Sequence, residues 1–535
     1  MTCRTHVFIL FLIVFGSFSL SAQKRLPPPP VDSVALSVKD SSQPLEIRHA
    51  DRLIFLKKDS SDLQIASGNV MLQQGTSLFY CDSCVLDQFG NLFEAWGSVR
   101  LIEKDTSDLR AKHLRYLIDR RIAYLDGDVR LNDGKGKLIT PELEYDLNSD
   151  IGVYKKGGTV YNGKTTLNSR EGFYYASLRD VYFIKDVSLK DPAYQIKTDT
   201  LLYNLDSKVT RFVTETEIRD SSGRIVETRE GFYNMTTGKA EFGKRPVIRD
   251  GKTTITGEKI RFDDDTGLSE AEGNVEIIDP AQGTKLLAGK VVRDKKKNTV
   301  LSTDHPVLIV EQDKDSVYIT ADTLFSGPLP ANKKIVKAEA VSIDSNLRFF
   351  RAYNHVRIFT DSLQAACDSL YYSYEDSVFR LYQEPVIWSR GSQITGDTII
   401  LRTKNKKAEK LDVFENSLLV QKLDPEVYNQ VKSIRMAAFL TDGGMDSLQA
   451  KGYAECIYFI QDDDSAYTGV NESNADRMDI YFQSGSIDRV VFRSEVTGTV
   501  WPMREKNPAS MRLTGFRWLD GQRPTSRMAI LKIKN

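Results

Sequence analysis

The stretch ASGNVMLQQGTSLFYCDSCVLD, from Ala66 to Asp87, contains two patterns from which most of the chain is built. The first is a glycine, a spacer and a valine that opens a run of alternating apolar residues, GNVML. The second is a small residue, an aspartate and further alternating apolar residues, CDSCVL. An apolar residue at every second position is typical of strands with one buried and one solvated face. The stretch therefore predicts β-strands.

Both patterns recur along the chain. The glycine–valine pattern returns as AWGSVRL at Ala95 and AEGNVEI at Ala271, and the aspartate pattern as TDTLLYN at Thr198 and CDSLYYS at Cys367. The first nine central positions are 27 to 32 residues apart, so about fourteen units of roughly thirty residues fill residues 45–500. A unit of this size holds two or three strands and cannot bury an apolar face alone, so the units must stack. We therefore expect an elongated all-β stack with one continuous apolar interior.

Composition and spacing divide the chain into segments. A basic start, the apolar run Val7–Phe15 and small residues before Gln23 are typical of a secretory signal peptide, predicted to be cleaved after Ala22. One step of 49 residues, after Val307, marks an internal boundary, and a second boundary near residue 190 rests on module size alone. The expected segments are a signal peptide 1–22, a Pro-rich linker 23–44, β-modules 45–190, 191–330 and 331–500, the last more divergent, and a tail 501–535. One short helix is expected, at Asp424–Met436.

Composition and motifs exclude several functions. Lys plus Arg and Asp plus Glu are equal at 73 each, which gives no basic surface for nucleic acid. Four cysteines follow the signal peptide, too few for a disulfide scaffold. The CDSC pair, Cys81 and Cys84, is interpreted as apolar filler, because residues three apart in a strand face opposite ways. The sequence has no phosphate-binding loop, dinucleotide fingerprint or nucleophile motif, and its histidines lack metal-ligand spacing. We therefore expect no enzymatic activity, no metal and no cofactor.

The recurring aspartate needs its own interpretation. Seven units carry it, namely Asp51, Asp82, Asp199, Asp322, Asp368, Asp397 and Asp476. Lys112 and Pro141 occupy the same slot in other units, and a catalytic carboxylate need occur only once or as a pair. We interpret the aspartate as an outward residue that helps to fix strand register and limits aggregation.

The inward positions leave two interpretations open. The candidate lipid-binding residues on this face are Val70, Leu72, Val99, Leu101, Leu114, Tyr116, Val129, Leu131, Leu201 and Tyr203. They form either the closed core of a structural or adhesive β-stack of the cell envelope, or an open trough for acyl chains. In a trough, each buried methylene contributes about 0.8 kcal/mol, so several chains would be held without any chemistry. Periodicity alone does not separate the two.

Together, the glycine–valine strand, the aspartate strand and the signal peptide resemble the OstA-like family, best in residues 66–87 and 271–292. The resemblance implies β-jellyroll modules of V-shaped, open cross-section that hold lipid A acyl chains between two sheets. This chain has the length of about three such modules, and the tail after Trp501 is too short for an outer-membrane barrel.

The function that the resemblance implies is lipopolysaccharide transport to the outer membrane for its assembly. The chain is then expected in the periplasm, or associated with the outer membrane. Its expected partners are lipopolysaccharide and the inner- and outer-membrane transport components, bound by edge-strand pairing. The terminal strands near Leu53 and Val500 would offer these edges, and would also allow head-to-tail self-association.

Overall fold

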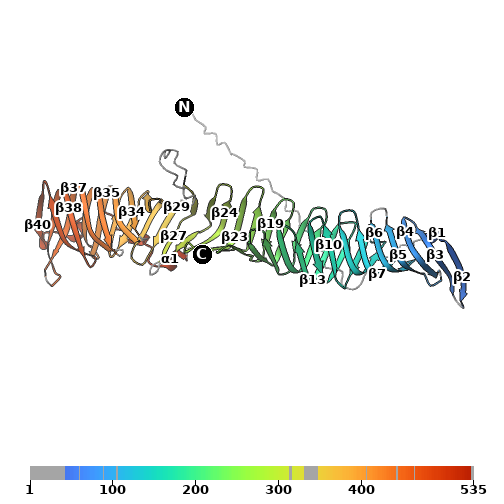
Figure 1. The fold of residues 1–535 in the computed structure, drawn as a ribbon. Helices are drawn as coiled ribbons and strands as arrows, with labels where there is room; N and C mark the ends of the chain where they lie inside the picture. Colours follow the sequence, from blue (N-terminus) through green and yellow to red (C-terminus); the bar gives the residue numbers. More distant parts are fainter. Residues whose placement is uncertain are drawn as a thin grey trace, which may run out of the picture.

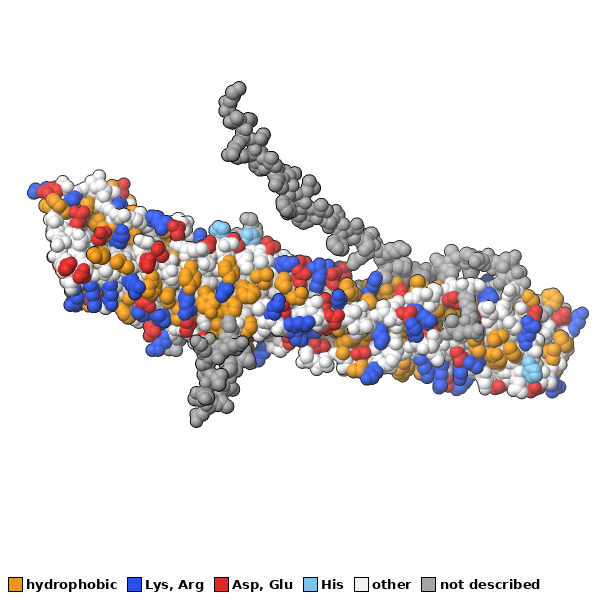
Figure 2. Space-filling model, turned by 90° about the horizontal axis from the view of Figure 1, so that it is seen from above, with side chains coloured by type: hydrophobic (Ala, Val, Ile, Leu, Met, Phe, Trp, Pro, Cys, Tyr) orange, Lys and Arg blue, Asp and Glu red, His pale blue; other side chains and the backbone are white. Residues whose placement is uncertain are grey.

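The computed structural model describes residues 43–58, 61–87, 89–103, 107–311, 316–329, 348–404, 407–441, 444–462 and 464–531. The predicted signal peptide and most of the linker lie outside these residues. The described chain is all-β, with antiparallel strands paired into one elongated stack that runs from β2 at one end to β40 at the other (Figure 1). Basic and acidic side chains both occur along the whole length of the face seen in Figure 2. No helix in the described residues is long and apolar enough to cross a membrane.

Sixteen long strands build the stack as successive hairpins. They are β3 (Ser61–Gln74), β4 (Ser77–Asp87), β5 (Leu92–Glu103), β6 (Ser107–Leu117), β7 (Ile122–Asn132), β8 (Lys137–Asp146), β13 (Asp180–Lys190), β14 (Tyr194–Asn204), β23 (Leu268–Asp279), β24 (Thr284–Asp294), β29 (Arg348–Phe359), β30 (Gln364–Ser373), β35 (Lys407–Asp424), β36 (Val427–Thr441), β37 (Gly444–Gln461) and β38 (Tyr467–Gln483). Each runs through two sheets, which are joined where these strands turn a corner. The rims of the two sheets, formed by the hairpin turns, lie away from the corner.

Shorter strands belong to one sheet each. Sheet I adds β2 (Arg52–Lys58), β9 (Ile151–Tyr154), β12 (Glu171–Tyr175), β15 (Val209–Phe212), β18 (Glu230–Asn234), β19 (Lys239–Gly243), β22 (Lys259–Asp263), β25 (Thr299–Thr303), β28 (Thr323–Pro328), β31 (Val378–Tyr382), β34 (Thr398–Lys404) and β39 (Ser486–Arg493). Sheet II adds β1 (Glu46–His49), β10 (Gly158–Asn162), β11 (Thr165–Ser169), β16 (Thr216–Asp220), β17 (Ile225–Thr228), β20 (Val247–Asp250), β21 (Thr253–Thr256), β26 (Val307–Val310), β27 (Val317–Thr320), β32 (Val386–Ser389), β33 (Ser392–Thr395) and β40 (Thr497–Pro502). Strands β14 to β23 form a closed ring of ten pairings, because β14 and β23 belong to both sheets.

The corner explains the glycine–valine pattern. In β3 the ladder with β4 shifts register between Ser67 and Val70, where Gly68 and Asn69 have φ of 78° and 47°. Glycine adopts this left-handed conformation without a Cβ clash. Other corners use pairs of positive-φ residues at 185–186, 244–245, 304–305, 354–355 and 415–416. At these corners the backbone adopts the left-handed conformation, and glycine supplies it where the pattern is strongest.

A corner also changes which side chains face inward. The register of β4 with β5 shifts between Tyr80 and Ser83, so Cys81 and Cys84 are both buried, at 5% and 1% exposure. The expectation that these two residues face opposite ways is wrong, because the alternation of buried and exposed side chains shifts where β4 turns the corner, with two less buried residues in succession, Asp82 and Ser83. Both are free thiols within the apolar core, as expected of filler.

The recurring aspartate lies on the outside of the corner. Asp82 accepts a hydrogen bond from the backbone N–H of Ser98 (2.9 Å), and Asp51 accepts one from the Asn69 side chain (2.9 Å). All seven copies are exposed. The outward placement is therefore confirmed, and these two contacts join adjacent strands at the corner. The roles in strand register and aggregation stay predictions.

Strand pairing continues across the predicted boundary near residue 330, because β27 and β28 both pair with β29. The buried residues nevertheless form two large apolar clusters, one from Leu45 to Val291 and one from Ile319 to Ile480. The module limits stay predictions.

The C-terminal tail returns along the outside of sheet II. Residues 503–531, named the strap here, contain η1 (Met503–Glu505), η2 (Pro508–Ser510), η3 (Asp520–Gln522) and α1 (Arg527–Leu531). The strap crosses the outer face from β38 towards β26, so α1 lies near β27 and not beside β40 (Figure 1). Ile530 of α1 packs with Val307 and Phe359. The sequence predicted a separate tail but not its path over sheet II.

Buried glutamines hold the strap by its backbone. Gln430 donates to the carbonyl of Met511 (2.8 Å) and accepts from the N–H of Leu513 (2.9 Å). Gln393 repeats this arrangement with the carbonyl of Arg517 and the N–H of Leu519, both at 2.8 Å. Neither glutamine is exposed. The strap is therefore a fixed third layer over part of sheet II.

The strap also explains an incorrect prediction. The expected helix at Asp424–Met436 is strand β36 (Val427–Thr441), which pairs with β35 and β37. All residues from Val427 to Val431 are buried, because the interior covers one face of this strand and the strap the other. Burial on both faces removes the alternation that identifies a half-buried strand.

Candidate functional site

The ten predicted lipid-binding residues line one interior. Val70, Leu72, Val99, Leu101, Val129 and Leu131 face it from sheet II, and Leu114, Tyr116, Leu201 and Tyr203 face it from sheet I. None is more than 3% exposed. Phe79 of sheet II lies 4.9 Å, between ring centroids, from Tyr116 of sheet I, so the two layers interdigitate. In the N-terminal segment, β1–β15, this interior is a closed core.

A row of polar contacts, the seam, joins the two rims of this segment. The hydroxyl of Tyr116 donates to Gln74 Oε1 (2.5 Å), and Arg121 Nη2 donates to Ser77 Oγ (2.9 Å). Further along, Asn162 Nδ2 donates to the Leu205 carbonyl (3.0 Å). In each pair one residue comes from sheet I and the other from sheet II. The seam therefore closes the mouth opposite the corner.

Asp133 is the charged centre of the seam. It accepts a hydrogen bond from the Tyr174 hydroxyl and lies 2.5 Å from Arg179 Nη1, both on the opposite rim. Burial alone would raise the pKa of Asp133, but the bonds from Tyr174, Gly136 and Lys135 and the charge of Arg179 lower it below its ordinary value. The ionised carboxylate is thus the form that this site stabilises.

Apolar side chains fill the space beneath the seam. Ile118, Leu147 and Leu205 lie at equivalent rim turns of sheet I and are 8%, 2% and 4% exposed. A cavity of about 20 Å³ remains between the sheets, with Leu131, Tyr154, Val160, Tyr174 and Leu205 in its wall. That volume holds about one water molecule. An acyl chain has no room here unless the seam opens.

The middle segment, β16–β28, has a different interior. Nine of its inward apolar residues are half-buried, and we name this set the window: Tyr233, Met235, Ile255, Phe262, Ile277, Leu286, Val300, Leu308 and Val317. Met235 lies at a rim turn of sheet I, in the position that Ile118, Leu147 and Leu205 occupy in the closed segment. At the next two such turns this position is Asp264 and Lys295, and both are exposed. Charged rim residues cannot cap an apolar interior, so this part of it meets solvent.

The window contains a continuous apolar row. Ile255, Ile277, Leu286, Leu308 and Ile319 stand opposite one another on five neighbouring strands of sheet II. With strands about 4.8 Å apart, this row extends roughly 19 Å along the stack. None of the five is among the ten residues predicted to bind lipid, although Ile277 and Leu286 lie in 271–292, where the repeat is clear. The charged rim positions Asp264 and Lys295 were the available signal.

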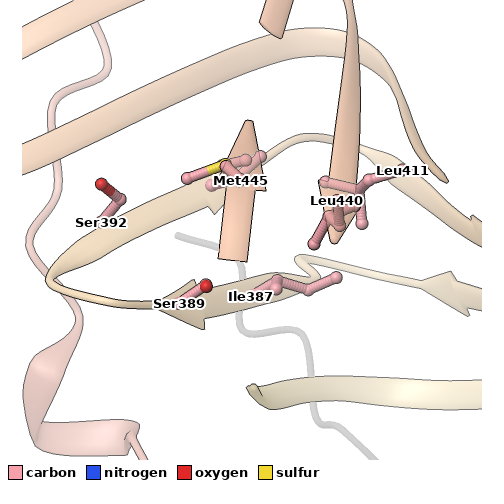
Figure 3. A pocket seen from close by; sticks show the side chains of 7 residues that line it. Ile387, Ser389, Ser392, Leu411, Leu440 and Met445 are labelled. Atoms are coloured by element: carbon pink, nitrogen blue, oxygen red, sulfur yellow. The ribbon is translucent and has the colours of Figure 1, made fainter. Parts of the chain in front are cut away.

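The C-terminal segment, β29–β40, is closed again. Leu411, Leu440 and Met445 of sheet I face Ile387 and Ser389 of sheet II around a cavity of about 10 Å³ (Figure 3). Gln421 Nε2 donates to the Gly485 carbonyl across the rims (3.1 Å). The window thus lies between two closed segments. The described residues contain no group of three or more His, Cys, Asp or Glu side chains placed to hold a metal ion.

Comparison with known proteins identifies part of the chain. Residues 42–199 match the family model described as OstA-like protein, which confirms the resemblance for these residues. Among solved structures, the chain is similar to the crystal structure of LptH, the LptA homologous periplasmic component of the conserved lipopolysaccharide transport device from Pseudomonas aeruginosa. The two are 14% identical over 29% of this chain and 79% of that chain, with a TM-score of 0.14. No curated protein sequence matches the chain.

Proposed function

Since residues 42–199 belong to the OstA-like family, we propose that this chain is a lipid-binding bridge that carries lipopolysaccharide towards the outer membrane. It acts without catalysis, in the periplasm after signal-peptide cleavage, with outer-membrane association as the alternative location. Its cross-section is the V of a jellyroll, two sheets joined at the corner, which takes lipid A acyl chains between them.

The half-buried row Ile255–Ile277–Leu286–Leu308 carries this proposal. The same inward positions are fully buried in the closed segments, so the window leaves apolar surface that a soluble stack has no reason to expose. Covering this surface with acyl chains should stabilise the complex by about 25 cal/mol per Å² of apolar surface removed from water, or about 0.8 kcal/mol per buried methylene. The window is the proposed place of lipid binding.

In this proposal the ten predicted residues of the closed segment contact lipid only when the seam opens. They continue the window's apolar surface along the stack, and Tyr203 lies in the same row of sheet I as the window residue Tyr233, with Thr210 between them. Lipid reaches Leu72 or Leu101 only after the seam separates. The window is therefore occupied first, and the closed interior later in the transport path.

The two ends of the stack are the proposed partner sites. β1 and β2 pair only with β3, and β39 and β40 only with β38, among the described strands. Leu53, Phe55 and Leu56 of β2 are 41%, 68% and 48% exposed, and Val500 of β40 is 62% exposed. Unpaired strand edges with exposed apolar side chains are suited to strand addition. Inner- and outer-membrane transport components, or a second copy in head-to-tail order, would pair there.

Photo-crosslinking in cells tests the function. A photoreactive residue at Leu286 should capture lipopolysaccharide, whereas its neighbour Lys285, on the outer face of the same strand, should not. Leu101 should capture less than Leu286, and the outward Arg100 none. Equal capture at Leu286 and Lys285 contradicts the proposal. If no lipid co-purifies with the natively extracted protein, and depletion of the protein causes no envelope defect, the alternative of a closed structural stack is favoured.

A further inference from the structure

One row of inward residues on sheet I changes chemistry at the window. Strand by strand it contains Tyr203, Thr210, Tyr233, Ala240, Phe262, Ser269, Arg293, Val300, Ser326 and Phe350. Aromatic residues occupy this row as far as Phe262. After it, Arg293 and Ser326 take the aromatic positions. A cation and a hydroxyl thus face the interior where it is open.

Arg348 brings a second cation to the same place. It precedes Phe350 by two residues on β29 and so faces inward beside it, one step nearer the rim. Its Nε donates to Ser326 Oγ (3.3 Å) and its Nη2 to the Asn298 carbonyl (3.1 Å). Burial lowers the pKa of Arg348, the charge of Tyr374 raises it, and the charge of Arg293 lowers it, so Arg293 acts electrostatically on Arg348.

These two arginines lack the partners that other rim arginines have. Arg121 lies 3.8 Å from Glu103, Arg179 2.5 Å from Asp133 and Arg224 3.0 Å from Asp220. Within the described part of the chain, no carboxylate lies within 4.0 Å of Arg293 or Arg348. Arg348 is partly buried and Arg293 is exposed on the same rim, with β25 and β28 between their strands. Two like charges within electrostatic reach of each other are unfavourable unless an anion compensates them.

We propose that Arg293 and Arg348 bind the phosphate group of an amphipathic lipid whose acyl chains cover the row Ile277–Leu286–Leu308. Guanidinium groups bind phosphate oxygens through paired N–H donors, and the Ser326 hydroxyl is placed to donate a further bond. The inference rests on the proposed lipid-binding function and adds the group that the site recognises. It also gives the lipid one orientation, with its phosphate at the rim of sheet I and its chains inside.

Equilibrium binding to the full mature chain tests the site with three probes: diphosphorylated lipid A, a dephosphorylated lipid A and inorganic phosphate. The wild-type protein should bind the phosphorylated lipid at least tenfold more tightly than the dephosphorylated one. The double variant Arg293→Gln and Arg348→Gln should lose this preference and keep its affinity for the dephosphorylated lipid. Arg351→Gln, on the outer face of the same strand β29, is the matched control and should change neither affinity.

The outcomes separate the two proposals. If the wild type binds both lipids equally, or Arg351→Gln lowers affinity as much as the double variant, the phosphate site is wrong and lipid binding stands. If neither lipid binds the wild type, the proposed function fails as well. If inorganic phosphate binds as tightly as the phosphorylated lipid, the arginines form a free-phosphate site and not a lipid site. The melting temperature of the double variant should not fall, because the substitutions remove a repulsion.

Discussion

The N-terminal and middle segments are built in the same way, from antiparallel strands that turn a corner between two sheets. One nevertheless has a closed core, whereas the interior of the other is open between the rims. The difference lies at a few rim positions. Leu147 and Leu205 cap the closed interior, where Asp264 and Lys295 stand at the equivalent turns of the open one. Among the inward aromatic residues of sheet I, Tyr116 and Tyr203 are fully buried, whereas Phe262 is half-buried. The repeat thus builds the walls, and rim residues decide whether the interior is accessible.

The largest expected effect compares a leucine in each segment. Leu101→Ala should cost about 2–5 kcal/mol, because it leaves a cavity in a packed core. Leu286→Ala should cost roughly 1 kcal/mol or less, since solvent already reaches this half-buried side chain. Native-state hydrogen exchange on the neighbouring strands measures both local costs. Equal costs would mean that the window is as tightly packed as the closed segment.

The second-largest effect is expected when the charge of Asp133 is removed from the seam. Asp133→Asn should lower the local free energy of opening by about 1.5–3 kcal/mol, because the hydrogen bonds from Tyr174 and Arg179 lose their ionic acceptor. Hydrogen exchange near β7 and β12 should accelerate, with no change near the window. Lys156→Gln, which loses an exposed ion pair with Glu142, is the control and should change neither region.

The same carboxylate predicts a pH dependence. The pKa of Asp133 is lowered in the folded chain, so its ionised form stabilises the seam at all pH values above the ordinary aspartate pKa of about 4. That contribution should be lost as the pH falls from about 4 through the lowered folded value. Exchange near β12 should therefore increase in acid in the wild type. Asp133→Asn should remove this part of the pH dependence; if it does not, another group closes the mouth.

A smaller effect concerns the strap, which covers sheet II over the C-terminal segment and reaches the window but not the N-terminal segment. Gln430→Ala removes two hydrogen bonds to the strap backbone, and should cost about 1–2 kcal/mol locally. Limited proteolysis should then cleave within residues 503–531 faster. Gln449→Ala, on the outer face of sheet I, should leave cleavage unchanged, and equal acceleration by both variants would argue against the glutamine contacts.

The smallest effect is a single neutral hydrogen bond of the seam. Tyr116→Phe removes the bond to Gln74 and should cost about 0.5–1.5 kcal/mol, measured as local opening by hydrogen exchange. Tyr124→Phe, at an exposed outward position, should cost nothing measurable. If both variants behave alike, apolar packing and not the seam keeps this segment closed.

The alternation of apolar and polar residues predicted the strands of both sheets and their inward and outward faces. The alternation in Ala66–Asp87 predicted the strands, and the repeated aspartate was placed correctly on the outside. Two errors have one cause each. Cys81 and Cys84 share a face because the corner shifts the alternation, and β36 resembled a helix because the strap buries its second face. A two-residue period describes regular strands with one covered face, and both sites depart from that condition.

The candidate site was predicted only in outline. The ten chosen residues do share one interior, but the repeat is equally clear in 271–292, which forms part of the window, so a clear repeat does not distinguish a closed segment from an open one. Arg293 and Arg348 are 55 positions apart in the chain. Only strand register places them on the same rim, with β25 and β28 between their strands.

By itself, the sequence determined the all-β stack, its repeat of about thirty residues, and the inward and outward faces of the strands. These follow from local alternation and from backbone conformations that single residues allow or forbid. The tertiary structure alone decided where the interior is closed, where it is open and what covers sheet II. Those features depend on pairs such as Asp133 with Arg179, or Gln430 with Leu513, that lie dozens of residues apart. No local pattern records such pairs, because each contact forms only once the strands are stacked.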